Sequence, residues 1–116
     1  MLKLNLSKEP VWFELAPGIR IQCIALTTSV MIRARADPAV QAVPDDASDE
    51  DRGIVFAQAL SRIVILDWEG IGDEEGEPVG VSPETIDALL EIWPIFEAFQ
   101  EKVVSKALLL ESEKNA

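Results

Sequence analysis

The feature that most constrains the fold is a pair of alternating apolar runs on either side of Pro17-Gly18. In both runs, Val11 to Leu15 and Ile19 to Ala25, every second residue is apolar. Because successive side chains of a strand point to opposite faces, this spacing predicts two strands, and the short turn predicts a β-hairpin. A lone hairpin is marginally stable in water, so this one must pack on helices or extend the sheet of another copy.

After the hairpin the apolar residues recur at helical spacing. The chain is therefore predicted to adopt an α+β fold that is mostly α-helical, with the N-terminal β-hairpin followed by about four helices. Thr27 and Thr28 are N-cap candidates for the first helix, which ends or kinks at Asp37-Pro38. Ser48 caps the second helix, for which we expect residues from Asp49 to about Trp68.

A third helix begins at Ser82-Pro83-Glu84, because this tripeptide supplies an N-cap, a proline at the first helical position and an acid near the positive helix end. Its apolar residues follow at amphipathic spacing as far as Trp93, and Pro94 breaks or kinks it. The last helix runs to Leu110. The predicted core consists of Phe13, Ile21, Cys23, Val30, Phe56, Leu60, Ile63, Ile86, Leu89, Leu90, Phe96 and Phe99.

The length of 116 residues fits a single domain, residues 1–116. Its expected parts are an N-terminal segment (1–9), the hairpin (11–25), a helical part (27–110) with acidic loops at 42–51 and 69–81, and a polar tail (111–116). Apolar residues make up 48% of the chain, too many for a disordered protein, yet no apolar run is long enough to span a membrane. The first nine residues lack the apolar core of a signal peptide, so we expect a cytoplasmic protein.

The residue types leave little room for catalysis. The chain has no histidine and no tyrosine, and its single cysteine, Cys23, alternates with apolar strand residues and should be a buried structural thiol. Carboxylates gather in the polar turns, and when the loop around Gly72 or Gly76 is aligned with a calcium-binding loop, Pro78 or Ser82 falls where the bidentate glutamate belongs. We therefore expect no catalytic residues, no metal site and no cofactor, and hence no enzyme.

The sequence instead favours protein binding. The net charge of −11 argues against nucleic acid as a ligand and should keep the protein soluble. The last helix carries more apolar residues than one core-facing stripe needs, which predicts partner binding and a homo-oligomer. Trp68 and Trp93 are each expected to end a helix, where they either pack in the core or face a partner. The candidate binding residues are Val103, Ala107, Leu108, Leu109, Leu110, Trp68 and Trp93.

Two stretches carry a resemblance to a known family. One runs from Trp68-Glu69-Gly70 through the acidic turn Asp73 to Pro78 into Ser82-Pro83-Glu84 and the paired Leu89-Leu90. The other is the hairpin turn Leu15 to Gly18 with the helix start that follows it. Together they resemble tail assembly chaperones of long-tailed phages and prophages, which combine a hairpin, a Trp-x-Gly helix end, an acidic turn and a capped helix with paired leucines.

The resemblance implies a chaperone that coats the tape measure protein in the cytoplasm of the bacterial host and is absent from the mature virion. It also implies a longer, frameshifted product that recruits the tail tube protein. Glu113, Lys114 and Asn115 can be encoded by a run on which ribosomes slip back one base. Two other functions remain open at this point: a structural component of the phage neck or tail terminator, and an acidic inhibitor that mimics DNA.

Overall fold

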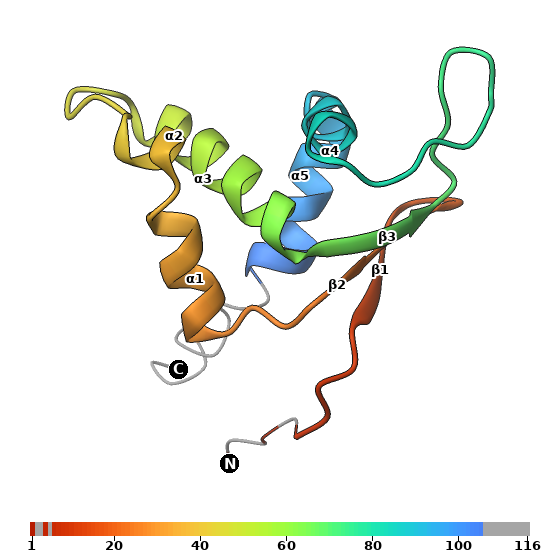
Figure 1. The fold of residues 1–116 in the computed structure, drawn as a ribbon, viewed down its shortest axis with the longest axis horizontal. Helices are drawn as coiled ribbons and strands as arrows, with labels where there is room; N and C mark the ends of the chain where they lie inside the picture. The colour runs from red at the N-terminus through yellow and green to blue at the C-terminus, as the bar shows by residue number, and fades with distance from the viewer. Residues whose placement is uncertain (2–3, 5, 106–116) are drawn as a thin grey trace.

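The computed structural model describes residues 1, 4 and 6–105, which form an α+β fold (Figure 1). Three antiparallel strands make one sheet in the order β1-β2-β3. The strands are β1 (Val11–Ala16), β2 (Ile19–Cys23) and β3 (Ile65–Glu69). The predicted hairpin is thus present, but it is only two thirds of the sheet.

The helices lie beside this sheet, with α1, α2 and α3 on one side of the molecule and α4 and α5 between them and the strands (Figure 1). The longest helix, α3, contacts α1, α2 and α4, and α5 lies against β1. The helices are α1 (Thr28–Arg35), α2 (Pro38–Gln41), α3 (Asp49–Val64), α4 (Pro83–Leu90), α5 (Trp93–Phe99) and a π-helical turn, η1 (Gln100–Val104).

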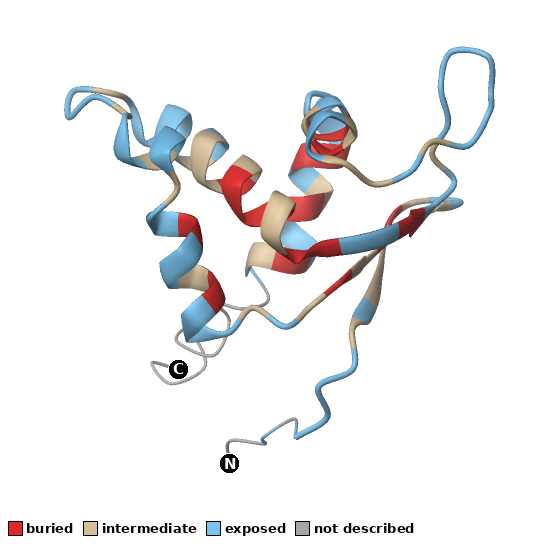
Figure 2. Ribbon diagram, in the orientation of Figure 1, coloured by how far each residue is buried: buried red, intermediate tan, exposed pale blue. Residues whose placement is uncertain are grey.

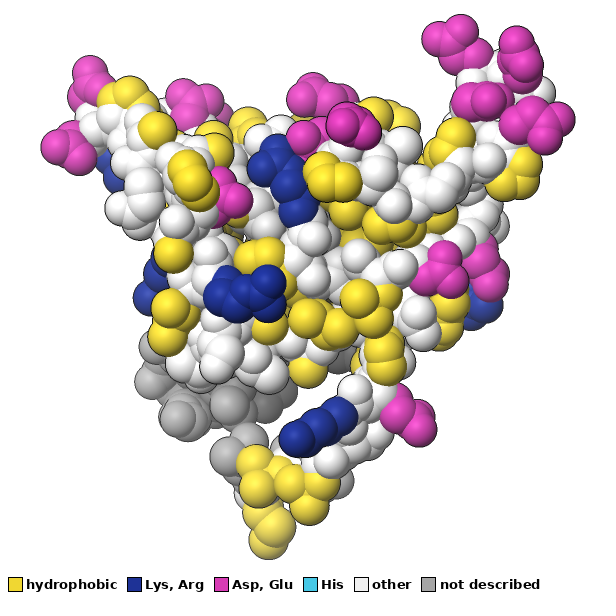
Figure 3. Space-filling view, viewed as in Figure 1, with side chains coloured by type: hydrophobic (Ala, Val, Ile, Leu, Met, Phe, Trp, Pro, Cys, Tyr) yellow, Lys and Arg dark blue, Asp and Glu magenta, His cyan; other side chains and the backbone are white. Residues whose placement is uncertain are grey.

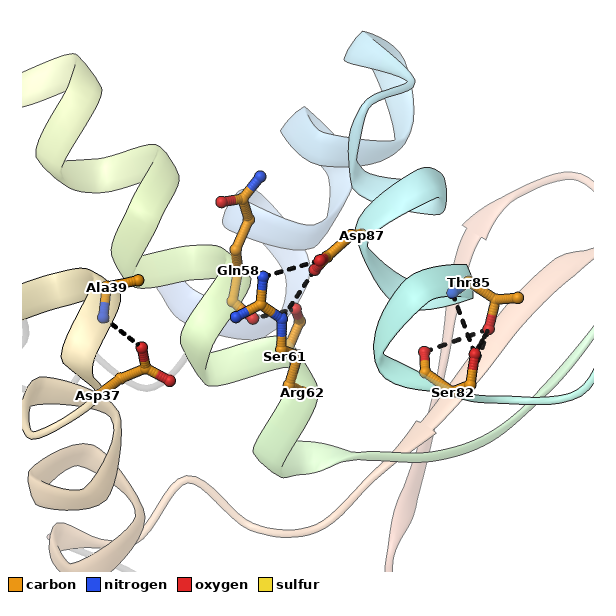
Figure 4. Close-up of polar contacts among 8 residues, drawn as sticks. All are labelled: Asp37, Ala39, Gln58, Ser61, Arg62, Ser82, Thr85 and Asp87. Carbon is orange, nitrogen blue, oxygen red and sulfur yellow. Dashed lines mark hydrogen bonds and ion pairs between the residues drawn. The ribbon is translucent and has the colours of Figure 1, made fainter.

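Three helix starts predicted from capping residues are confirmed. The hydroxyl of Thr27 accepts a hydrogen bond from the backbone N–H of Val30, and Ser48 caps α3 in the same way. At α4 the Ser82 hydroxyl accepts from the N–H of Thr85 (3.2 Å) while the Thr85 hydroxyl accepts from the N–H of Ser82 (2.9 Å; Figure 4). This reciprocal pair is a capping box, which satisfies two backbone donors that a helix start leaves free.

The expectation that the second helix reaches Trp68 is wrong. Helix α3 ends at Val64, whose carbonyl accepts a hydrogen bond from the N–H of Ile24 (2.9 Å), and the chain continues as β3. The run Ile63 to Leu66 is apolar and rich in β-branched residues, so its local propensity suits a strand as well as a helix. The open edge of the hairpin decides between them, because pairing there satisfies its backbone groups.

A bulge in β3 explains how this strand places two side chains in the core. Cys23 pairs with Ile65 and Gln22 pairs with Asp67, so Leu66 is an extra residue opposite β2. In a regular strand Ile65 and Trp68 would point to opposite faces, since they are three residues apart. The bulge allows both to be buried, and it leaves Leu66 exposed.

The third helix also ends earlier than its apolar spacing predicts. Helix α4 stops at Leu90, and Trp93 begins α5 instead of ending α4. Pro94 therefore occupies the first turn of a helix, where its missing N–H has no partner to lose. With the short α2, the described chain has five α-helices and one π-helical turn, where about four helices were expected.

Most of the predicted core is buried, as Figure 2 shows for the segments of α3, α5 and the sheet that face one another. Phe13, Phe56 and Ile63 are only half-buried and pack against its margin. Ser61 is fully buried, and its hydroxyl donates to the carbonyl of Gln58 (2.8 Å; Figure 4). An ion pair joins α3 to α4: Arg62 donates through two nitrogens to the carboxylate of Asp87, each at 2.8 Å (Figure 4).

The acidic side chains gather on two projecting corners of the molecule and between them (Figure 3). One corner is the connection between α2 and α3, where the guanidinium of Arg52 donates to the carbonyls of Pro44, Asp45 and Ala47. The other is the loop after β3, where the carboxylate of Asp73 accepts from two backbone N–H groups of the same turn. Both corners were predicted as polar loops.

Candidate partner-binding groove

A groove lies between the first turns of α3 and the outer side of α5. Its volume is about 600 Å³. We call it the α3–α5 groove, and it is lined by Asp49, Glu50, Gly53, Ile54, Trp93, Phe96 and Gln100. All of these residues lie in helices, so side chains and one bare glycine form its surface.

Trp93 is the most exposed aromatic residue along this groove, with 63% of its surface accessible. Helix α5 buries Ile95, Phe96 and Phe99, which turns Trp93 toward solvent at the start of the helix. Its ring stacks on that of Phe96, with centroids 5.9 Å apart and planes 15° from parallel. Because Phe96 is itself held in the core, the stack favours this orientation of the exposed tryptophan ring.

The opposite wall is formed by α3. Ile54 is 39% exposed, and a Cβ atom added at Gly53 would meet nothing within 4 Å. Gly53 does not adopt a positive φ, so the backbone gives no reason for a glycine there. A glycine inside a helix is roughly 0.5–1 kcal/mol less stable than alanine. Gly53 therefore lowers the stability of α3 slightly, and it leaves part of the groove wall without a side chain.

Within the described part of the chain, the two charged residues that line the groove are both acidic. Asp49 and Glu50 lie in the first turn of α3, where the helix dipole favours carboxylates. The nearby Arg52 is occupied by three backbone carbonyls of the preceding loop. The groove is thus an apolar surface with negative charge at one end.

A second, smaller hollow of about 250 Å³ lies on the other side of the α4–α5 corner. It separates the loop after β3 from α4, and Ile71, Val79, Leu89 and Ile92 are among its lining residues. Ile92 is 52% exposed and directly precedes Trp93. The corner therefore presents two adjacent apolar side chains, one toward each hollow.

The structure buries some of the candidate binding residues predicted from the sequence and exposes another. Trp68 is buried, and its indole N–H donates to the carbonyl of Val79 (2.8 Å), so it packs in the core. Val103 is also buried, whereas Trp93 is exposed. Ala107, Leu108, Leu109 and Leu110 lie outside the described residues.

Sequence reasoning missed the other groove residues. Gly53, Ile54 and Phe96 looked like ordinary helix or core positions, because their spacing does not tell which neighbouring helix covers them. The one available indication was a glycine within an otherwise regular amphipathic helix.

On the exposed face of the sheet, charged and aromatic side chains of neighbouring strands contact one another. Arg20 donates to both carboxylate oxygens of Glu69 (2.7 and 3.0 Å) and lies over the ring of Trp12. The hydrogen bond from Arg20 lowers the pKa of Glu69 below its usual range. Among the described residues, no group of three or more histidine, cysteine or acidic side chains could hold a metal ion.

The thiol of Cys23 is expected to be unreactive in the folded protein. Burial raises its pKa from 9.0 to about 12, which leaves about a thousandfold less thiolate at pH 8. Labelling with an aromatic disulfide reagent should therefore be slow in buffer and fast in guanidinium chloride. Rapid labelling under native conditions would contradict the tight packing of β2.

Comparison with known protein families gives a match over most of the chain. Residues 27–116 match the model of a family described as YdaY prophage protein, and this range starts at the cap of α1 and includes β3. No curated protein and no solved structure matches the chain. Within the described residues, no helix has the length and apolar character needed to cross a lipid bilayer.

Proposed function

The chain belongs to the YdaY prophage protein family, and from that premise we propose that it is a tail assembly chaperone without catalytic activity. In this proposal it binds the tape measure protein of its prophage in the host cytoplasm and keeps it soluble until the tail is built. The observation that carries the proposal is the α3–α5 groove, with Trp93 exposed in it and stacked on Phe96.

The groove has the properties that binding of helical segments requires. Exposed, rigid tryptophans are frequent energetic centres of protein interfaces, and apolar hollows between helices accept the apolar face of another helix. The net charge of −11 would keep a complex soluble, and six of the 21 acidic residues lie in the two projecting loops outside the groove. The sequence resemblance to tail assembly chaperones supports the same role.

Two further parts of the proposal concern assembly. Without a partner, the exposed residues Ile92 and Trp93 would favour a homo-oligomer, because association covers apolar surface. A longer, frameshifted product would recruit the tail tube protein.

Co-expression with the tape measure protein of the same prophage tests the function. The chain is expected to raise the soluble fraction of that protein and to co-purify with it, and the complex should persist at about 0.3 M salt because apolar burial is weakly screened. Trp93→Ala should reduce co-purification at least tenfold, since an aromatic hot spot contributes about 2 kcal/mol or more. The matched control is Ile32→Ala, an exposed apolar residue on α1 that is not among those lining the groove.

Equal solubility of the tape measure protein with and without the chain would refute the chaperone role. The competing role, a structural component of the neck or tail terminator, predicts that the chain is present in purified phage particles. Mass spectrometry of particles separates the two, because a chaperone is absent from them.

A further inference from the structure

We propose that the α3–α5 groove binds a single amphipathic α-helix of the partner, in which lysine or arginine residues flank the apolar face. This inference rests on the proposed function and specifies the chemistry of the segment that is bound. It follows from the backbone, the shape and the charge of the groove.

The backbone argument selects a helix. Every described residue that lines the groove belongs to α3, α5 or η1, and none belongs to a strand. The groove therefore offers no strand edge to which an extended peptide could pair. A bound segment has to satisfy its own backbone groups, and an α-helix does so.

The shape argument concerns close approach. On the α3 side of the groove, Gly53 has no side chain and lies beside Ile54 and the acidic first turn. On the α5 side, the ring of Trp93 stacks on that of Phe96. A helix that lies between them buries Ile54 and Trp93 together and approaches the backbone of α3 at Gly53. Small residues at helix crossings permit such short separations between helix axes.

The charge argument selects the flanking residues. Asp49 and Glu50 lie at one end of the groove, and Glu97 is exposed one helical turn after Trp93 on α5. None of the described residues that line the groove is basic. Covering the apolar centre excludes water from the margins, so these carboxylates favour basic side chains and disfavour acidic ones.

Two fluorescently labelled 18-residue peptides test the inference by anisotropy with the full chain. Both carry leucine at helical i, i+3, i+4 and i+7 spacing, and the remaining positions are lysine in one and glutamate in the other. The lysine peptide should bind at least tenfold more tightly than the glutamate peptide. Trp93→Ala and Gly53→Leu should each weaken its binding about tenfold, one by removing the anchor and the other by filling the bare wall.

Paired charge variants separate local from general electrostatics. Asp49→Asn with Glu50→Gln should weaken binding of the lysine peptide about fivefold, as expected when two exposed ion pairs are lost. Glu74→Gln with Glu75→Gln changes the net charge equally, on the loop after β3, and should leave affinity within twofold. Thermal unfolding of each variant confirms that it is folded. Equal effects of the two pairs would overturn the inference.

The remaining outcomes keep this inference distinct from the proposed function. If the tape measure protein co-purifies in a Trp93-dependent way but the lysine peptide does not bind, the helix chemistry is wrong and the chaperone role stands. A further outcome is a dimer, seen by light scattering, that the Trp93→Ala variant no longer forms and that the lysine peptide does not dissociate. In that case a second copy of the chain occupies the groove and the inference fails. If the peptide binds as expected but the tape measure protein is unaffected, the groove chemistry is supported and the chaperone role fails.

Discussion

Replacing Phe99 with alanine is expected to lower the free energy of unfolding by about 3–5 kcal/mol. Phe99 is fully buried at the junction of α5 and η1, and α5 packs against β1 there. The substitution removes a ring from the contact between the helices and the sheet, and the cavity cannot close without moving one of them. Urea unfolding followed by circular dichroism measures the loss, which is large beside the total stability of roughly 5–15 kcal/mol for a domain.

Trp93→Ala is the matched control, because it removes an aromatic ring from the same helix. Trp93 is mostly exposed, so only its stacking on Phe96 is lost, at a cost of about 0.5–1.5 kcal/mol. A comparable loss for both variants would mean that Trp93 is covered in solution and that the groove described here is closed.

Gly70→Ala is the second large destabilisation we expect, of about 3 kcal/mol or more. Gly70 adopts a φ of +82°, and a Cβ atom at this position would lie 1.9 Å from the carbonyl oxygen of Gly18. The methyl group would therefore strain the backbone and also push the end of β3 away from the hairpin turn. The expected result is a lower urea midpoint, measured by circular dichroism.

Gly76→Ala separates the two contributions. Gly76 has nearly the same φ, +81°, but a Cβ atom there would meet nothing within 4 Å. It should lose only the backbone term, roughly 1–2 kcal/mol. If Gly70→Ala is no more destabilising than Gly76→Ala, the close packing of β3 on the hairpin turn is incorrect.

The candidate site could be predicted only in part. Trp93 was a candidate from sequence, but so was Trp68, and each was expected to end a helix. Burial separated them: the indole of Trp68 is buried and donates to the carbonyl of Val79, whereas Trp93 begins a helix whose apolar face points away from it. The acidic end of the groove was visible as a charge cluster, yet its neighbour across the groove comes from α5, more than forty residues later.

The sequence by itself determined the local structure. The hairpin turn at Pro17-Gly18 depends on the backbone preferences of these two residues, and Gly18 adopts a positive φ of 79° there. The helix starts at Thr27, Ser48 and Ser82 depend on hydroxyl groups that bond to the neighbouring backbone, so no distant residue is needed to specify them. The tertiary structure decided what becomes of segments whose local preferences are balanced. Residues 65–69 form a strand because β2 has an edge with which they pair. Trp93 is exposed because the face of α5 that carries Ile95, Phe96 and Phe99 packs in the core.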